Sequence, residues 1–88
     1  MKIKDQLISA ATDWDRKQAK KKYYNPNGLG IMFQMVDLVC QDIEQGTPKR
    51  QAIMKGFNDR LLSHMLKSVG EKDYTAEEMN GIPVVYNA

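Results

Sequence analysis

The fold is decided by residues 29–45, LGIMFQMVDLVCQDIEQ. Apolar residues recur in this segment at spacings of three and four, which places their side chains on one face of an α-helix. That broad face consists of Leu29, Met32, Phe33, Val36, Val39, Cys40 and Ile43. A second apolar strip lies on another side of the same helix and consists of Ile31, Met35 and Leu38. A helix with two apolar sides is central to its domain or is shared with a partner.

Turn signals on both sides of this segment define its neighbours. Upstream, the run Asn25-Pro26-Asn27-Gly28 stops a first helix, because proline disfavours helical geometry in the residue before it. Downstream, Gly46 suits the left-handed residue that closes a helix, Thr47 would cap the next helix and Pro48 would occupy its first turn. We therefore expect helices over residues 3–23, 29–45 and 48–69.

The C-terminal part of the chain contains a short helix signal and an apolar tail. Residues 75–78, TAEE, match a capping box and predict one helical turn over residues 75–80. The tail, residues 81–88, would either cover the helices or bind another chain. We predict a single all-α domain over residues 1–88: a small three-helix bundle with a short fourth helical turn and an extended C-terminal tail.

Composition narrows the cellular setting and the chemistry. The 88 residues contain one cysteine, Cys40, and one histidine, His64, so no intrachain disulfide can form and a cytoplasmic protein is expected. The N-terminus is charged and does not suggest a signal peptide. The longest apolar-rich stretch is shorter than the ~18–20 residues of a membrane span, so no membrane association is expected.

The sequence offers little for catalysis or metal binding. One histidine and one cysteine form no recurrent ligand spacing, so neither a metal nor another cofactor is expected. Cys40 lies on an apolar face, where cysteine is usually a small core residue. His64 would act as its base only if the two helices bring them together; a structural histidine paired with Asp37 or Asp59, or facing solvent, is the alternative. We expect no enzyme.

Positive charge is concentrated near the N-terminus. Residues 1–26 carry seven Lys or Arg and three Asp, whereas residues 27–88 carry six Lys or Arg and eight Asp or Glu. The basic stretch mixes cations with aromatic rings: Arg16, Lys17, Lys20, Lys21, Lys22, Tyr23 and Tyr24. Such a stretch would contact nucleic acid or an acidic protein, or would simply be a solvated helix end.

The sequence contains more apolar residues than three short helices would bury between them. The six methionines add adaptable side chains that suit both irregular cores and binding surfaces. The predicted interface for another protein, or for a second copy of the chain, consists of Ile31, Met35, Leu38, Leu62, Leu66, Ile82, Val84, Val85 and Tyr86. Large uncovered apolar patches usually mark such interfaces.

Residues 57–69, FNDRLLSHMLKSV, resemble the third-helix segment of the theta subunit family of bacterial DNA polymerase III. The shared elements are the Phe, Arg-Leu, His, Leu and Ser-Val at matching spacing. This chain departs from that family in a longer second-helix region, an apparent insertion around residues 47–56 and a different tail. The resemblance implies a small three-helix, non-catalytic subunit that binds and stabilises a proofreading exonuclease. It assigns no partner-binding residue here.

The leading functional hypothesis is a non-enzymatic helical protein-binding module. Its expected role is that of a phage or mobile-element accessory protein or inhibitor that acts on a host nucleic-acid-processing protein. One alternative is a small DNA- or RNA-binding protein that uses residues 16–24. Further alternatives are a theta-like stabilising subunit and a homodimer whose seam is the helix over residues 29–45.

Overall fold

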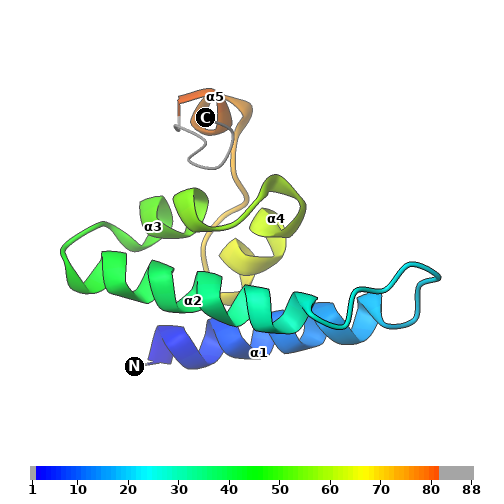
Figure 1. Ribbon diagram of the computed structural model, residues 1–88. Helices are drawn as coiled ribbons and strands as arrows, with labels where there is room; N and C mark the ends of the chain where they lie inside the picture. The colour runs from blue at the N-terminus through cyan, green and yellow to red at the C-terminus, as the bar shows by residue number, and fades with distance from the viewer. Residues whose placement is uncertain (1, 82–88) are drawn as a thin grey trace.

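The computed structural model describes residues 2–81, and these form five helices without a β-strand (Figure 1). The all-α prediction is confirmed. The helices are α1 (Lys2–Gln18), α2 (Gly28–Glu44), α3 (Lys49–Gly56), α4 (Asp59–Ser68) and α5 (Ala76–Gly81). The predicted apolar strip of the tail lies outside the described residues: Ile82, Val84, Val85 and Tyr86.

Helices α1 and α2 lie side by side and run in opposite directions, joined by the turn over residues 19–27 (Figure 1). α1 ends at Gln18, so the prediction of a helix to residue 23 was too long. The apolar residues of α1 recur at spacings of three and four and end before this point: Ile3, Leu7, Ala10, Ala11 and Trp14. The basic residues that follow have no core to pack against. Without burial of an apolar face, a helical extension gains little stability.

α2 contacts both α1 and α3, which is the central position that was one of the two alternatives predicted for it. Its buried residues are Met32, Val36, Val39 and Cys40. α4 packs against α1 and closes the core from the other side. The core also takes Leu7 from α1, Ile53 from α3 and Phe57 from the link between α3 and α4.

The single helix predicted over residues 48–69 is wrong, because the chain forms two helices there. α3 ends at Gly56, and Phe57 is extended with φ −119° and ψ 147°. Asn58 then caps α4, its side-chain oxygen accepting a hydrogen bond from the N–H of Leu61 at 3.1 Å. The break buries Phe57 and turns α4 back over the core.

Two further helix-end predictions have different outcomes. Thr47 does not cap α3: Pro48 occupies the N-cap position, and no side-chain hydrogen bond is made there. The capping box at the start of α5 is confirmed. The N–H of Glu78 donates to the hydroxyl of Thr75 at 3.1 Å, and the N–H of Thr75 donates to the Glu78 carboxylate at 3.0 Å.

α5 lies apart from the other helices (Figure 1) and contains no buried residue. It contacts the other helices through Arg50 of α3 and through half-buried Met79, which packs against the core. Gly46 and Gly70 have positive φ angles of 104° and 78°, as expected for residues that close helices. Within residues 2–81, no helix combines the length and apolar content that crossing a bilayer requires.

Candidate protein-interaction site

His64 has a structural contact rather than a carboxylate partner. Its Nε2 lies 2.9 Å from the backbone oxygen of Ala10, and its ring centroid is 5.6 Å from that of Trp14. The predicted pairing with Asp37 or Asp59 is wrong. Asp37 lies beside Lys4, with a carboxylate-to-amine distance of 3.3 Å. The histidine therefore joins α4 to α1.

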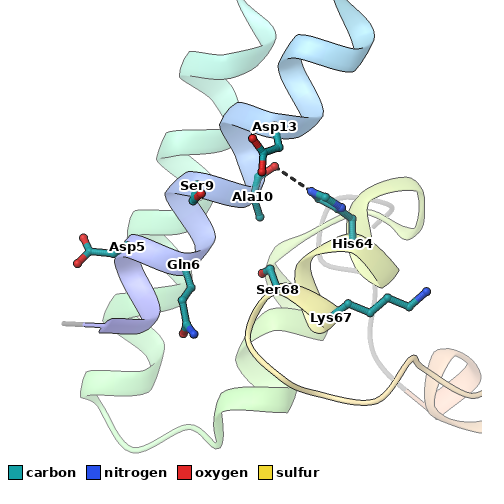
Figure 2. Close-up of a pocket in the computed structure, with 8 residues that line it drawn as sticks. All are labelled: Asp5, Gln6, Ser9, Ala10, Asp13, His64, Lys67 and Ser68. Atoms are coloured by element: carbon teal, nitrogen blue, oxygen red, sulfur yellow. Dashed lines mark hydrogen bonds between the residues drawn. The ribbon is translucent and has the colours of Figure 1, made fainter.

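Figure 2 shows the hollow beside this contact, between α1 and α4. It has a volume of about 570 Å³, and His64 reaches across it to the backbone at Ala10 while Lys67 extends away from α1. Its other polar side chains are Asp5, Gln6, Ser9, Asp13 and Ser68. No three metal-ligating side chains come together in the described part of the chain. This hollow offers no evident reactive pair.

Cys40 lies on the buried side of α2, where the apolar pattern placed it. Burial raises the pKa of its thiol, and the nearby carboxylates of Asp37 and Glu44 act in the same direction. Lys4 opposes these effects, yet the net direction is upward. A thiol with a raised pKa is a poor nucleophile at neutral pH, so Cys40 acts as a core residue.

A second hollow, which we call the groove, is formed where the end of α1, the start of α2 and the start of α4 meet. Its volume is about 320 Å³. Its apolar and glycine lining consists of Trp14, Gly28, Ile31, Met32, Met35 and Leu61. Its polar lining consists of Asp15, Gln18, Tyr23, Tyr24, Asn25, Asn58 and Arg60. The apolar residues give it the character of a binding site for an apolar side chain.

Hydrogen bonds between distant segments hold the groove in shape. The hydroxyl of Tyr24 donates to both carboxylate oxygens of Asp15 at 2.9 Å, which fastens the turn to α1. This hydrogen bond raises the pKa of Tyr24, since losing the proton would place a negative charge beside the carboxylate. Arg60 of α4 donates to the side-chain oxygen of Gln18 at 3.3 Å. The walls are thus connected before any ligand arrives.

The predicted basic stretch contributes Tyr23 and Tyr24 to the groove lining, and its cationic residues lie outside that lining. We call it the basic turn: Arg16, Lys17, Lys20, Lys21, Lys22, Tyr23 and Tyr24. Its cationic residues are exposed, whereas Tyr24 is half-buried and serves the groove. Tyr23 is 89% exposed, and the Lys22 amine lies 5.7 Å from the centre of its ring.

Few of these cations are neutralised. Arg16 lies 3.9 Å from Asp13, a distance that makes at most a weak pair at this exposed position. Lys17, Lys20, Lys21 and Lys22 have no ion-pair partner among residues 2–81. A local positive potential therefore lies beside an apolar groove.

The predicted apolar interface divides into exposed and buried parts. Ile31 and Leu38 of α2 are 51% and 61% exposed, and Met35 between them is half-buried. Leu62 and Leu66, in contrast, are 0% exposed, so their assignment to an interface is wrong. The break before α4 turns the apolar face of that helix onto the core, which leaves these two leucines inside.

Sequence patterns missed several residues that build the groove. Trp14, Met32, Leu61 and Arg60 come from three helices and meet only in the folded chain. The one available signal was Trp14, a large aromatic residue at the last position of the apolar stripe in α1. An aromatic residue at such a boundary is positioned to line an edge of the core.

No protein-family model, curated protein or solved structure matches this chain. The resemblance of residues 57–69 to the theta family therefore stays a prediction.

Proposed function

We propose that this chain is a non-enzymatic helical protein-binding module, and that the groove and the basic turn are its binding surface. The observation that carries the proposal is the groove itself, which is lined by Trp14 and Met35. It lies beside the basic turn, whose lysines have no ion-pair partner among residues 2–81. Aromatic residues, methionine and arginine are the residue types enriched at the centres of protein interfaces.

The chemistry of this surface favours an acidic protein segment with one projecting apolar side chain. The apolar side chain would enter the groove and displace water from Trp14 and Met35. Acidic residues on either side of it would face the exposed lysines of the basic turn. Such charge complementarity accelerates association and selects among partners more than it adds affinity.

The proposal is tested by filling the groove without disturbing the fold. Gly28 lines the groove, and a Cβ built on it meets no atom within 4 Å. Gly28→Phe should therefore occupy the groove, whereas Gly30→Phe, at an equally open glycine of the same helix outside the groove, is the matched control. Circular dichroism of both variants would establish that they fold.

The readout is the set of proteins retained from a bacterial lysate by the immobilised chain. We expect a specific protein to be retained by the original chain and by Gly30→Phe, and to be lost with Gly28→Phe. Equal retention by the two variants would show that the groove is not the binding site. Repeated recovery of no specific protein would count against the module itself.

Nucleic acid is the second candidate ligand. The observation that favours it is the exposed Tyr23 ring beside Lys22, because aromatic rings and lysines together bind single strands by stacking and phosphate contact. Asp13 and Asp15, which lie next to the basic turn, disfavour it by repelling phosphate. Gel shifts at two salt concentrations test this candidate, since phosphate contacts weaken steeply as salt rises.

The expected result for nucleic-acid binding is a shift at low salt that disappears when Lys20, Lys21 and Lys22 are changed to Glu. Lys67→Glu, at an exposed position of α4, controls for the loss of positive charge elsewhere. No shift at low salt, or a shift that survives the triple change, would eliminate this candidate.

A finer proposal concerns the partner's identity. Support for a host nucleic-acid-processing protein, and for a role as a phage or mobile-element accessory protein, comes from the theta-like segment alone. Within that segment Phe57, Leu61, Leu66 and Val69 are buried, and His64 joins α4 to α1. These residues support the fold, so the segment favours a theta-like architecture more than a particular contact with an exonuclease.

A further inference from the structure

The exposed strip of α2 borders the groove at Ile31 and extends beyond it to Gln34 and Leu38, which do not line the groove. Among the described residues, the large hydrophobic side chains that are mostly exposed are Tyr23, Ile31 and Leu38. Ile31 and Leu38 are seven residues apart, which is two helical turns, so they share one face and lie about 10 Å apart along the axis. The uncharged Gln34 lies between them and is exposed. Leu38 does not line the groove.

Charges of opposite sign lie at the two ends of this strip. The N-terminal end of α2 adjoins the turn that carries Lys20, Lys21 and Lys22 (Figure 1). The C-terminal part of α2 carries Asp42, four residues after Leu38 and so on the same face, and it has no ion-pair partner in residues 2–81. The face is therefore apolar in the middle, positive at one end and negative at the other.

A face with this charge order is complementary to an inverted copy of itself. We propose that two copies of the chain associate through α2, packed antiparallel about a two-fold axis near Gln34. Ile31 of each copy then lies opposite Leu38 of the other, and Asn27 lies opposite Asp42. The lysines of each basic turn approach the acidic end of the other α2. An isologous contact of this kind closes after two subunits.

The alternative orientation is disfavoured by the same charges. Parallel packing would place the two basic turns together and the two acidic ends together. It would also align the two helix dipoles, whereas antiparallel packing opposes them favourably. The order of charge along α2 therefore selects the antiparallel pair.

The size of the strip sets the strength of the contact. Two mostly exposed apolar side chains from each copy supply less than the ~800 Å² per partner of a standard stable interface. The dimer should be reversible and should dissociate on dilution. Its charged ends should make it weaker as ionic strength rises, since exposed ion pairs are screened by salt.

Sedimentation velocity over a range of concentrations, at low and high salt, tests the association. We expect a dimer at high concentration that Leu38→Glu weakens at least tenfold. Gln51→Glu, an equal change of charge at an exposed position of α3, should leave the dimer unchanged. A monomer at every concentration, or a dimer unaffected by Leu38→Glu, would overturn the proposal.

Cysteine cross-linking tests the orientation. Under oxidising conditions, a mixture of the Asn27→Cys and Asp42→Cys chains should form a disulfide-linked dimer. Each variant alone should not, because equivalent positions lie about 22 Å apart in the antiparallel pair. The original chain controls for Cys40, which is buried. Cross-linking of the single variants without preference for the mixture would contradict the antiparallel arrangement.

This proposal and the proposed function fail separately. Leu38→Glu alters the strip and leaves every residue of the groove lining unchanged, whereas Gly28→Phe fills the groove, which the strip borders at Ile31. Loss of dimerisation with retained capture of a partner, or the reverse, identifies which surface is correctly assigned.

Discussion

Gly56 ends α3 directly against Val39 of α2, and the close approach of the two helices depends on its missing side chain. A Cβ at this position would collide with a methyl group of the buried Val39. Both partners sit at a helix–helix contact in the core, where atoms have little room to move. The packing of α3 on α2 therefore requires glycine here.

Gly56→Ala should lower the free energy of unfolding by about 1–3 kcal/mol, the usual range for forcing extra atoms into a packed core. Urea denaturation followed by circular dichroism would measure the change. The matched control is Gly30→Ala, where the new methyl group meets open space within α2. That change should raise stability by about 0.5–1 kcal/mol, because alanine is the better helix former. An unchanged free energy of unfolding in Gly56→Ala would contradict the close contact between Gly56 and Val39.

The same region shows why the break between α3 and α4 was not predicted from the sequence. Ile53, Phe57 and Leu61 are spaced four residues apart, so the apolar periodicity continues across a point where the helix does not. Gly56 is a poor helix former, and Asn58 followed by Asp59 is a typical helix start. Both signals favour a break, but the continuous apolar periodicity was the stronger indication and predicted one helix.

α5 is attached to the remainder of the chain through hydrogen bonds from Arg50 of α3 and through half-buried Met79, which packs against the core. The guanidinium donates to both carboxylate oxygens of Glu78, at 2.7 and 2.8 Å, and to the backbone oxygens of Lys72 and Asp73, at 2.7 and 2.9 Å. A bidentate arginine–carboxylate pair is the strongest common geometry of this type. The pairing raises the pKa of Arg50.

Acid should release α5. The hydrogen bond from Arg50, aided by the N–H of Thr75, lowers the pKa of Glu78 from 4.5 to about 2. The folded-state pKa lies below the unfolded one, so this attachment contributes fully above about pH 4.5. The contribution falls as the pH drops from there towards 2, because the unfolded state binds the proton first. NMR signals of α5 followed between pH 6 and pH 2 would show this loss.

Glu78→Gln should remove most of this pH dependence and leave α5 loosely attached at every pH. Glu77→Gln, at the exposed neighbouring position, is the control and should keep the transition. An unchanged transition in Glu78→Gln would assign the acid sensitivity to another group.

The capping box of α5 was predictable because Thr75 and Glu78 are only three residues apart in the sequence. Arg50 was not, because it precedes Glu78 by 28 residues.

At the scale of the whole molecule, local patterns predicted the helices and missed the site. The apolar stripe of α2 indicated its central position, because that stripe is continuous in the sequence. The groove combines Trp14, Met35 and Leu61, whose proximity depends on how three helices cross. The prediction that Leu62 and Leu66 would be exposed failed for the same reason, since burial depends on the neighbours that the fold supplies.

The position of Trp14 has a practical consequence. It is the only tryptophan in the chain, and it lies in the wall of the groove beside His64. All indole emission from this protein therefore originates at that wall. A molecule that enters there changes the polarity around the fluorophore and is visible in the spectrum without a label, whereas detachment of α5 occurs at a helix that contributes no emitter of this kind.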